Sequence, residues 1–152
     1  MHTTALSSAQ TFTAGLTAAN SLEWSDYLGI AIFVIGFLFE VVGDAQLGAH
    51  IADQDPNKGK FCKRGLWRYT RHPNYFGEAL LWWGIYCFSF AVNGYWTFFS
   101  PLVITLLLRF LSGVPMLERK ARKHPEWAQY EAETNTFFPW FWDKNAVPSK
   151  DE

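Results

Sequence analysis

The sequence predicts an all-α, polytopic membrane protein with about three transmembrane helices and short cytoplasmic helices near its C-terminus. Residues Ala79–Leu108 contain no acidic, basic or histidine residue, which is typical of chain that crosses a bilayer. Aromatic residues make up 18% of the 152, which excludes intrinsic disorder. One domain fits this length. We assign it to residues 27–142, after an N-terminal segment 1–26 that is either disordered or interfacial, and before a tail 143–152.

The membrane-spanning helices follow from the apolar runs and the turn signals between them. Residues Ala79–Leu108 would form a helix of about 45 Å, which is too long for one comfortable crossing. Asn93 and Gly94 supply a turn within this run, because both tolerate positive φ. An earlier apolar stretch is interrupted only by Glu40. The predicted spans are therefore Tyr27–Gly43, Tyr75–Val92 and Tyr95–Leu111.

The distribution of charge predicts the orientation. No Lys or Arg precedes Lys58, and three spans place the segment 44–74 and everything after Leu111 on one side, together with nearly all basic residues. Because basic loops favour the cytoplasm, we expect that side to be cytoplasmic. A net charge of -1 argues against a nucleic-acid partner. Cys62 and Cys87 lack the spacing of a metal site, and we expect no bound metal.

Polar residues gather at one depth, near the cytoplasmic ends of the three predicted spans. Glu40 and Asp44 are four residues apart on the first span, and Asn74 and Glu78 repeat that spacing at the start of the second. Arg109 lies two residues inside the end of the third. Ionisable groups at this depth are costly unless they are paired or line a wet cavity. The pattern predicts a polar pocket that opens to the cytoplasm, or else ion pairs that only hold the helices together.

A second group of residues favours an anion. Arg71 and His72 precede Pro73 and Asn74 at the predicted start of the second span, where backbone N–H groups are free. A ligand that carries several phosphates would suit this positive region. The alternatives are that His72 caps the helix, and that the loop lysines and arginines serve topology and anionic lipid headgroups.

Several motifs occur in a fixed order along the chain. They are GDAQL at Gly43–Leu47, NKGK at Asn57–Lys60, GLWRYTRHPNYFGEALLWWG at Gly65–Gly84, SGVPMLE at Ser112–Glu118 and FFPWF near the C-terminus. Together they resemble the C-terminal membrane region of the steroid 5-alpha-reductase superfamily, in particular its DUF1295 branch. The resemblance covers roughly Trp24 to Trp142. A more distant similarity extends to sterol C14 reductases and isoprenylcysteine carboxyl methyltransferases.

The resemblance implies that NADPH binds from the cytoplasmic side and reduces an activated carbon–carbon double bond of a lipid, such as a steroid enone. In such a reaction an acid stabilises the oxyanion that develops at the carbonyl group. By position, the residues that resemble cofactor contacts are Asp44, Arg71, His72, Asn74, Arg109 and Glu118.

The chain departs from the family pattern ahead of these motifs. Family members usually carry several further spans there, and in steroid reductases those spans hold the Glu and Tyr that bind the carbonyl group. Only one predicted span precedes the motifs here. Tyr69, Tyr75 and Glu78 are the local candidates for the missing acid. We expect a truncated product, a half-enzyme that needs a partner or self-association to supply helices, or a remnant without turnover.

Three functions from different classes remain open. The first is an NADPH-dependent membrane reductase that acts on a lipid or steroid double bond, which the basic loops favour because NADPH carries three phosphate groups. The second is an S-adenosylmethionine-dependent membrane methyltransferase, which explains the RHPNYFG motif but not the positive field. The third is a non-catalytic membrane subunit.

Overall fold

The computed structural model describes residues 22–140, and these form helices joined by short turns and one longer loop, with no strand in that range. Most of the predicted N-terminal segment and the whole of the predicted tail lie outside the described residues. In chain order the helices are α2 (Trp24–Ala52), η1 (Gly65–Arg68), α3 (Pro73–Ala91), η2 (Tyr95–Phe98), α4 (Phe99–Leu106), the π-helical turn η3 (Leu107–Leu111), α5 (Val114–Ala121) and α6 (Trp127–Glu133).

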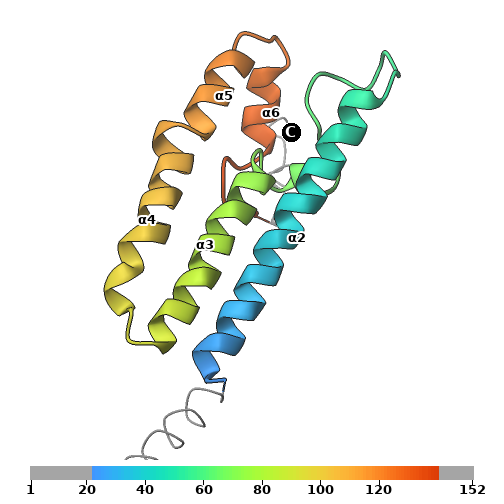
Figure 1. The fold of residues 1–152 in the computed structure, drawn as a ribbon. Helices are drawn as coiled ribbons and strands as arrows, with labels where there is room; N and C mark the ends of the chain where they lie inside the picture. Colours follow the sequence, from blue (N-terminus) through green and yellow to red (C-terminus); the bar gives the residue numbers. More distant parts are fainter. Residues whose placement is uncertain (1–21, 141–152) are drawn as a thin grey trace, which may run out of the picture.

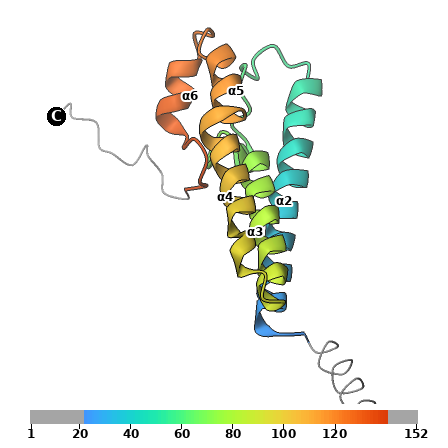
Figure 2. The ribbon, with the colours of Figure 1, turned by 60° about the vertical axis from the view of Figure 1, so that its left-hand side comes forward.

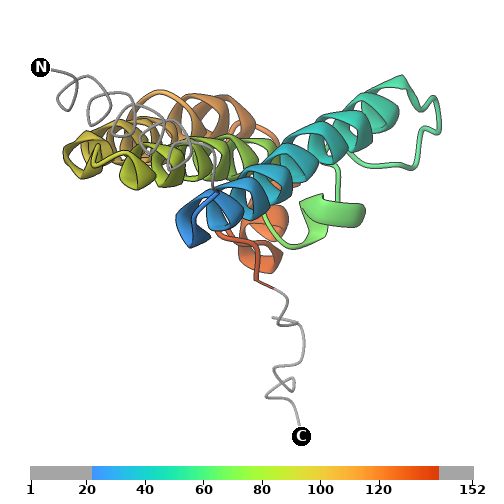
Figure 3. The ribbon, with the colours of Figure 1, turned by 60° about the horizontal axis from the view of Figure 1, so that its bottom comes forward.

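The three long helical segments lie side by side, with α3 between α2 and α4 (Figures 1 and 3). The start of α2 and the α3–α4 turn are at one end of the bundle. Helix α5 continues the direction of α4, and α6 folds back beside α5 at the other end, near the loop that follows α2 (Figures 1 and 2). All the lysines and arginines of the described segment lie in this second end, from Lys58 to Arg71 and from Arg109 to Lys123, and we call it the head.

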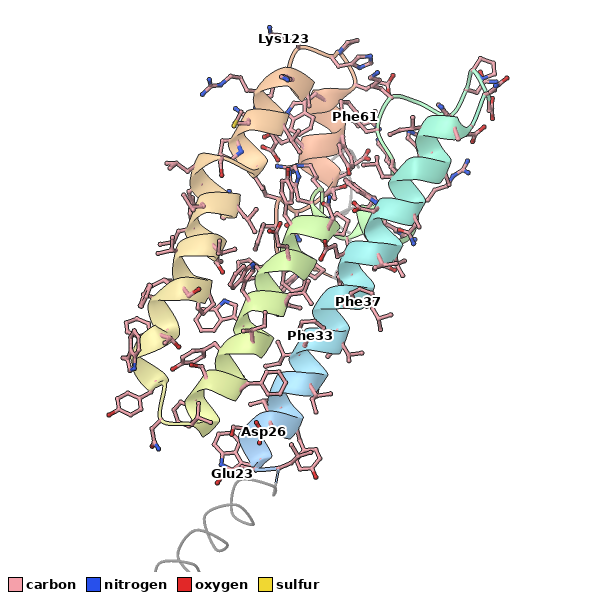
Figure 4. All side chains as sticks on the ribbon, in the orientation of Figure 1. Glu23, Asp26, Phe33, Phe37, Phe61 and Lys123 are labelled. Carbon is pink, nitrogen blue, oxygen red and sulfur yellow. The ribbon has the colours of Figure 1, made fainter. Side chains whose placement is uncertain are left out.

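Two helical stretches, Trp24–Ala52 and Tyr95–Ala121, are long and apolar enough to cross a membrane. Helix α3, which the sequence predicted as a third span, is a helix close to the predicted bounds but is not among the stretches that meet this measure. Large apolar side chains on these stretches face outward: Phe37 is 51% exposed and points away from α3 (Figure 4), and Val103 on α4 is 47% exposed. This inside-out distribution is compatible with an integral membrane protein.

Helix α2 continues to Ala52, well beyond the predicted end at Gly43. The apolar pattern stops at Gly43, but helix-compatible residues follow, and the end of the helix is set by Lys58 from the next loop. Its ammonium group donates hydrogen bonds to the backbone carbonyls of His50, Ile51 and Asp53. A cation at this position satisfies carbonyl groups that the helix leaves without a partner.

Helices α2 and α3 pack through glycines. A Cβ atom at Gly36 would lie 2.7 Å from the carbonyl oxygen of Gly77, and one at Gly77 would lie 2.5 Å from the carbonyl oxygen of Gly36. Gly29 and Gly84, each seven residues away from the first pair, meet in the same way. A Cβ atom at either of them would lie 2.9 Å from the carbonyl oxygen of the other. Small residues let two backbones approach closely, which is the common packing mode of membrane helices. We call this contact the glycine interface.

The predicted turn and the predicted C-terminal helices are confirmed. Helix α3 ends just before Asn93, which adopts a φ of 61°. Helix α6 begins at Trp127, because the chain between His124 and Trp127 forms a turn closed by a 3.0 Å backbone hydrogen bond. Trp127, Tyr130 and Thr134 are buried on one face.

Candidate functional site

Arg71 lies two residues before α3 and fixes the C-terminal segment to the head. Its Nε donates to Glu118 Oε1 on α5 (2.9 Å), and its Nη1 donates to the carbonyls of Glu131 (3.1 Å) and Thr134 (2.5 Å). Its Nη2 donates to Thr136 Oγ1 (2.9 Å). Arg71 is 5% exposed. We call Arg71, Glu118 and the segment 134–136 the clamp.

Backbone pairing at Thr70 and Arg71 positions the clamp. Thr70 forms an isolated parallel bridge with Asn135, and the Arg71 N–H donates to the Asn135 carbonyl at 2.8 Å. The Thr70 hydroxyl donates to the carbonyl of Phe137 at 2.9 Å. Thr70 is fully buried, so these polar groups find their partners inside the protein. The hydrogen-bonded backbone at Thr70 and Arg71 therefore holds the guanidinium group of Arg71 in position to reach α5 and α6.

His72 also faces Glu118. Its Nε2 is 3.3 Å from Glu118 Oε1, and its ring stacks on Tyr75 with 5.7 Å between ring centroids. His72 is the residue before the helical turn that Pro73 begins, as the sequence predicted. The positive region at this helix start does favour an anion, but the anion that lies against both Arg71 and His72 is the carboxylate of Glu118. Both basic residues are thus engaged within the fold.

A cavity of about 190 Å³ lies beside the clamp, between the end of α2 and the helices α5 and α6. We call it the head cavity. Phe61 stacks on Tyr130 with 5.2 Å between centroids (Phe61 is labelled in Figure 4). The Tyr130 hydroxyl donates to the carbonyl of Trp67, and burial raises the pKa of Tyr130 above its usual range. The remaining lining residues are Leu47, Lys60, Cys62, Arg71, His72, Asn74, Leu117, Glu118, Ala121 and Trp127.

The structure brings together the predicted polar residues of α2 and α3. The Asn74 side-chain amide donates to Asp44 Oδ1 at 3.0 Å. Glu40 interacts electrostatically with both Asp44 and Glu78. Within residues 22–140, no Lys or Arg forms an ion pair with any of these three carboxylates. They therefore form an acidic group. The alternative that Glu40 and Asp44 form ion pairs that hold the helices together is wrong for the described residues.

Arg109 is separate from that acidic group. It lies in the π-helical turn η3, with its guanidinium carbon 4.9 Å from the centroid of the Phe110 ring. Among the described residues it has no ion pair and no side-chain hydrogen bond. The predicted ring of polar groups at one depth is thus divided into an acidic part on α2 and α3 and a basic part at Arg109.

Arg109 borders two pockets. The first, of about 340 Å³, is lined by Val114, Pro115, Glu118, Arg119 and Arg122 in addition to Arg109, and we call it the arginine pocket. The second, of about 510 Å³, is lined by Asn135, Thr136, Phe137, Phe138 and Trp140 in addition to Arg109, and we call it the tail pocket. Glu118 lines both the arginine pocket and the head cavity, so these two sites are neighbours.

The three candidate acids lie outside these pockets. Tyr69 follows η1, and its carbonyl accepts a hydrogen bond from the Trp140 N–H at 3.2 Å. Tyr75 lies in the first turn of α3 against His72, and Glu78 is half-buried one turn further along. None of the three lines the head cavity, the arginine pocket or the tail pocket.

Sequence reasoning missed several residues that line the cavities. Phe61 and Trp67 form one wall of the head cavity, and Arg119 and Arg122 lie in the arginine pocket. Trp67 is held by a 2.8 Å hydrogen bond from its Nε1 to the carbonyl of Gly43 on α2. The available signal for Phe61 and Trp67 was the concentration of aromatic and basic residues between Lys60 and Tyr69.

Comparison with known proteins places the chain in a family. Residues 1–134 match a family described as a protein of unknown function, DUF1295. The chain belongs to the DUF1295 family. This is the branch of the steroid 5-alpha-reductase superfamily that the motifs predicted. The match extends from α2 through α6 and includes the residues of the glycine interface and most of the clamp.

One similar protein is the uncharacterized protein C594.04c of Schizosaccharomyces pombe, which is 26% identical over 136 residues. The alignment covers 75% of the present chain and 39% of the yeast protein, so the chain spans about two-fifths of the length of this relative. No solved structure matches the chain.

Proposed function

We propose that this DUF1295 protein is a membrane oxidoreductase that uses NADPH to reduce a carbon–carbon double bond of a steroid-like or other lipid enone. The observation that carries the proposal is the arginine pocket. Arg109 and Arg119 have no ion pair within the described segment, although each is a permanent cation. Guanidinium groups that converge on an open pocket suit phosphate oxygens, because the planar fork can bind them in pairs.

The charge of the ligand decides among the alternatives for this pocket. NADPH carries a pyrophosphate and a third phosphate, which would use several cations. S-adenosylmethionine is zwitterionic, with a cationic sulfonium and no phosphate, so it would leave most of the positive charge of the arginine pocket without a partner. Arg122 contributes less than the other two, because it already pairs with Glu131 at 3.0 Å and lies 3.8 Å from Glu118.

The head cavity would receive the uncharged part of the cofactor. It adjoins the arginine pocket at Glu118, and Phe61 and Trp67 supply flat apolar walls. Asn74 offers an amide that is held in place by Asp44. When bound, NADPH would supply a hydride to the substrate. The clamp would hold α5 and α6 over the cavity and exclude water from one side.

The proton for the reduced lipid needs a donor near the membrane. Tyr75 and Glu78 lie on α3 just below the head, where a lipid could approach from the bilayer, and Tyr69 lies above them. We propose that the head faces the cytoplasm, because it holds all the basic residues of the described segment. The chain spans about two-fifths of the length of its relative, and we propose that further helices, whichever chain they belong to, complete the substrate site.

Equilibrium binding of NADPH to the detergent-purified protein tests the proposal, with S-adenosylmethionine measured in parallel. We expect saturable NADPH binding, which Arg119→Ala weakens about tenfold, since a hydrogen bond to a charged group contributes roughly 1.5–3 kcal/mol. Lys120→Ala is the matched control, because Lys120 is an exposed cation next in sequence that lines none of the three pockets.

Three outcomes would contradict the proposal. Equal weakening of NADPH binding by Lys120→Ala would show that the general positive charge of the head, and not the arginine pocket, attracts the ligand. Binding of S-adenosylmethionine alone would assign the protein to the methyltransferases. Binding of neither ligand by a folded protein would favour the non-catalytic subunit.

A further inference from the structure

The tail pocket lies apart from the head cavity, on the side of η3 where the chain returns from α6. Its walls are the last turn of the apolar helix and the segment 135–140 that the clamp holds in place. The side chains beside it face outward: Phe110 is 61% exposed, Phe138 is 65% exposed and Trp140 is 59% exposed. Exposed aromatic residues at the end of an apolar helix are typical of the boundary between lipid and water.

Arg109 brings an unpaired positive charge to this boundary. It is half-buried, and its guanidinium group lies over the Phe110 ring in a cation–π contact. A cation that is partly removed from water and lies among outward-facing apolar groups is costly unless an anion accompanies it. None of the six described residues that line the tail pocket is acidic. The pocket therefore has a net positive charge that the described part of the protein does not neutralise.

Two further polar groups converge on the same space. The side-chain amide of Asn135 has no hydrogen bond in the described structure, although its backbone carbonyl accepts one from Arg71. The Thr136 hydroxyl oxygen accepts a hydrogen bond from Arg71 Nη2, which leaves its own proton available to a ligand. The pocket thus offers a guanidinium group, an amide and a hydroxyl as donors, and no carboxylate acceptor.

We propose that the tail pocket binds the phosphate of an anionic phospholipid from the cytoplasmic leaflet. Arg109, Asn135 and Thr136 would donate hydrogen bonds to the phosphate oxygens, and the acyl chains would extend along Phe138 and Trp140 into the bilayer. A volume of about 510 Å³ exceeds what a phosphate group alone requires and leaves room for the glycerol part of a lipid. The chemistry of the donors suits any phosphate, whereas the outward-facing aromatic residues select one attached to a lipid.

The pocket shares Arg109 with the proposed cofactor site but is otherwise distinct from it. Asn135 and Trp140 line the tail pocket alone, and Arg119 lines the arginine pocket but not the tail pocket. This separation allows the two proposals to fail independently. Asn135→Ala is expected to leave NADPH binding unchanged, and Arg119→Ala is expected to leave lipid retention unchanged.

Native mass spectrometry of the detergent-purified protein tests the proposal. The protein is stripped of lipid and titrated with phosphatidylglycerol, with phosphatidylcholine, and with phosphatidylglycerol in the presence of inorganic phosphate. We expect phosphatidylglycerol to bind about tenfold more tightly than phosphatidylcholine, and Arg109→Gln to weaken it about tenfold. Asn135→Ala and Trp140→Ala should weaken it several-fold, and Asn135→Ala preserves the backbone carbonyl that Arg71 needs.

Trp96→Ala is the matched control for Trp140→Ala. Trp96 is 65% exposed and lies in η2 at the opposite end of the bundle. Equal lipid retention by the wild type, Asn135→Ala and Trp140→Ala would overturn the proposal, as would equal affinity for the two lipids or an equal loss in Trp96→Ala. Displacement of the lipid by millimolar inorganic phosphate would overturn the lipid assignment and identify a site for free phosphate.

Discussion

The glycine interface and the clamp join helices by opposite means. Between α2 and α3, the Gly36 and Gly77 backbones meet with no side chain between them. In the head, a long side chain, Arg71, connects α3 to α5 and α6 through hydrogen bonds and an ion pair with Glu118. The two kinds of contact suit two different surroundings, lipid around the apolar helices and water around the head. Lipid provides no hydrophobic force between apolar helices, so close packing joins them, whereas the head can bury aromatic and charged groups away from water.

This difference predicts different sensitivities to substitution. The glycine interface has no charge to lose and no free volume, so added atoms should disturb it. The clamp contains a buried ion pair, so the loss of one partner leaves the other without compensation. Each region also contains a nearby residue of the same type that makes no comparable contact, which provides a matched control.

The largest effect is expected for Arg71→Met. This substitution keeps most of the side-chain volume but leaves Glu118 buried beside His72 without its main cation, and it removes the donors to three acceptors on the C-terminal segment. We expect the free energy of unfolding of the detergent-solubilised protein to fall by about 3–5 kcal/mol. Denaturant titration followed by tryptophan fluorescence measures it.

Arg68→Met is the control for that prediction. Arg68 lies three residues earlier, is exposed, and has no ion pair within the described segment. We expect a change within about 0.5 kcal/mol. If Arg68→Met and Arg71→Met cost the same, the clamp would not be a main source of stability in the head.

The next effect concerns a single methyl group at the glycine interface. In Gly77→Ala the new Cβ would lie 2.5 Å from the Gly36 carbonyl oxygen and 2.6 Å from the Glu40 backbone nitrogen, so the two helices must separate. We expect a loss of about 1–3 kcal/mol in the free energy of unfolding. The decrease in melting temperature in detergent provides a second measurement.

Gly48→Ala adds the same methyl group where nothing lies within 4 Å. Because alanine favours the helix, we expect Gly48→Ala to raise the free energy of unfolding by about 0.5–1 kcal/mol. The opposite signs of the two substitutions are the critical result. A loss at both positions would mean that glycine is needed in α2 and α3 for a reason other than the distance between the two backbones.

The sequence predicted the features that depend on local pattern. The helix at each predicted span and the turn at Asn93 follow from composition and spacing over a few residues. The motifs predicted the family. The end of α2 was missed because Lys58, which satisfies its last carbonyls, lies beyond the helix itself.

The features that depend on distant contacts were predicted less well. The polar ring was predicted from depth and spacing, and neither determines which side chains meet. Asn74 bonds to Asp44, whereas Arg109 lines the arginine pocket and the tail pocket, which none of the acidic residues of α2 and α3 lines. The glycine interface was also missed, although its signal was present. Glycines recur every seven residues at 29, 36 and 43, and again at 77 and 84, which places each set on one helix face.

The smallest effect is expected for an ion pair at the surface of the head. Lys63 Nζ donates to Glu133 Oε2 at 2.9 Å, and this hydrogen bond lowers the pKa of Glu133. The two side chains remain 39% and 29% exposed, so the pair should contribute less than about 1 kcal/mol. We expect Glu133→Gln to lower the free energy of unfolding by that small amount at pH 7, in contrast to the loss expected when the buried partner Arg71 is replaced.

The pH dependence gives this last prediction its sign. Because folding lowers the pKa of Glu133, its contribution is present above the unfolded pKa of about 4.3 and is lost as the pH falls through the lower folded value. The stabilities of the wild type and Glu133→Gln should therefore differ at pH 7 and converge below about pH 4, and the difference at pH 7 should shrink in high salt. A difference that persists at acid pH and in high salt would show that Glu133 acts through its contact with Gln129, at 2.7 Å, rather than through its charge.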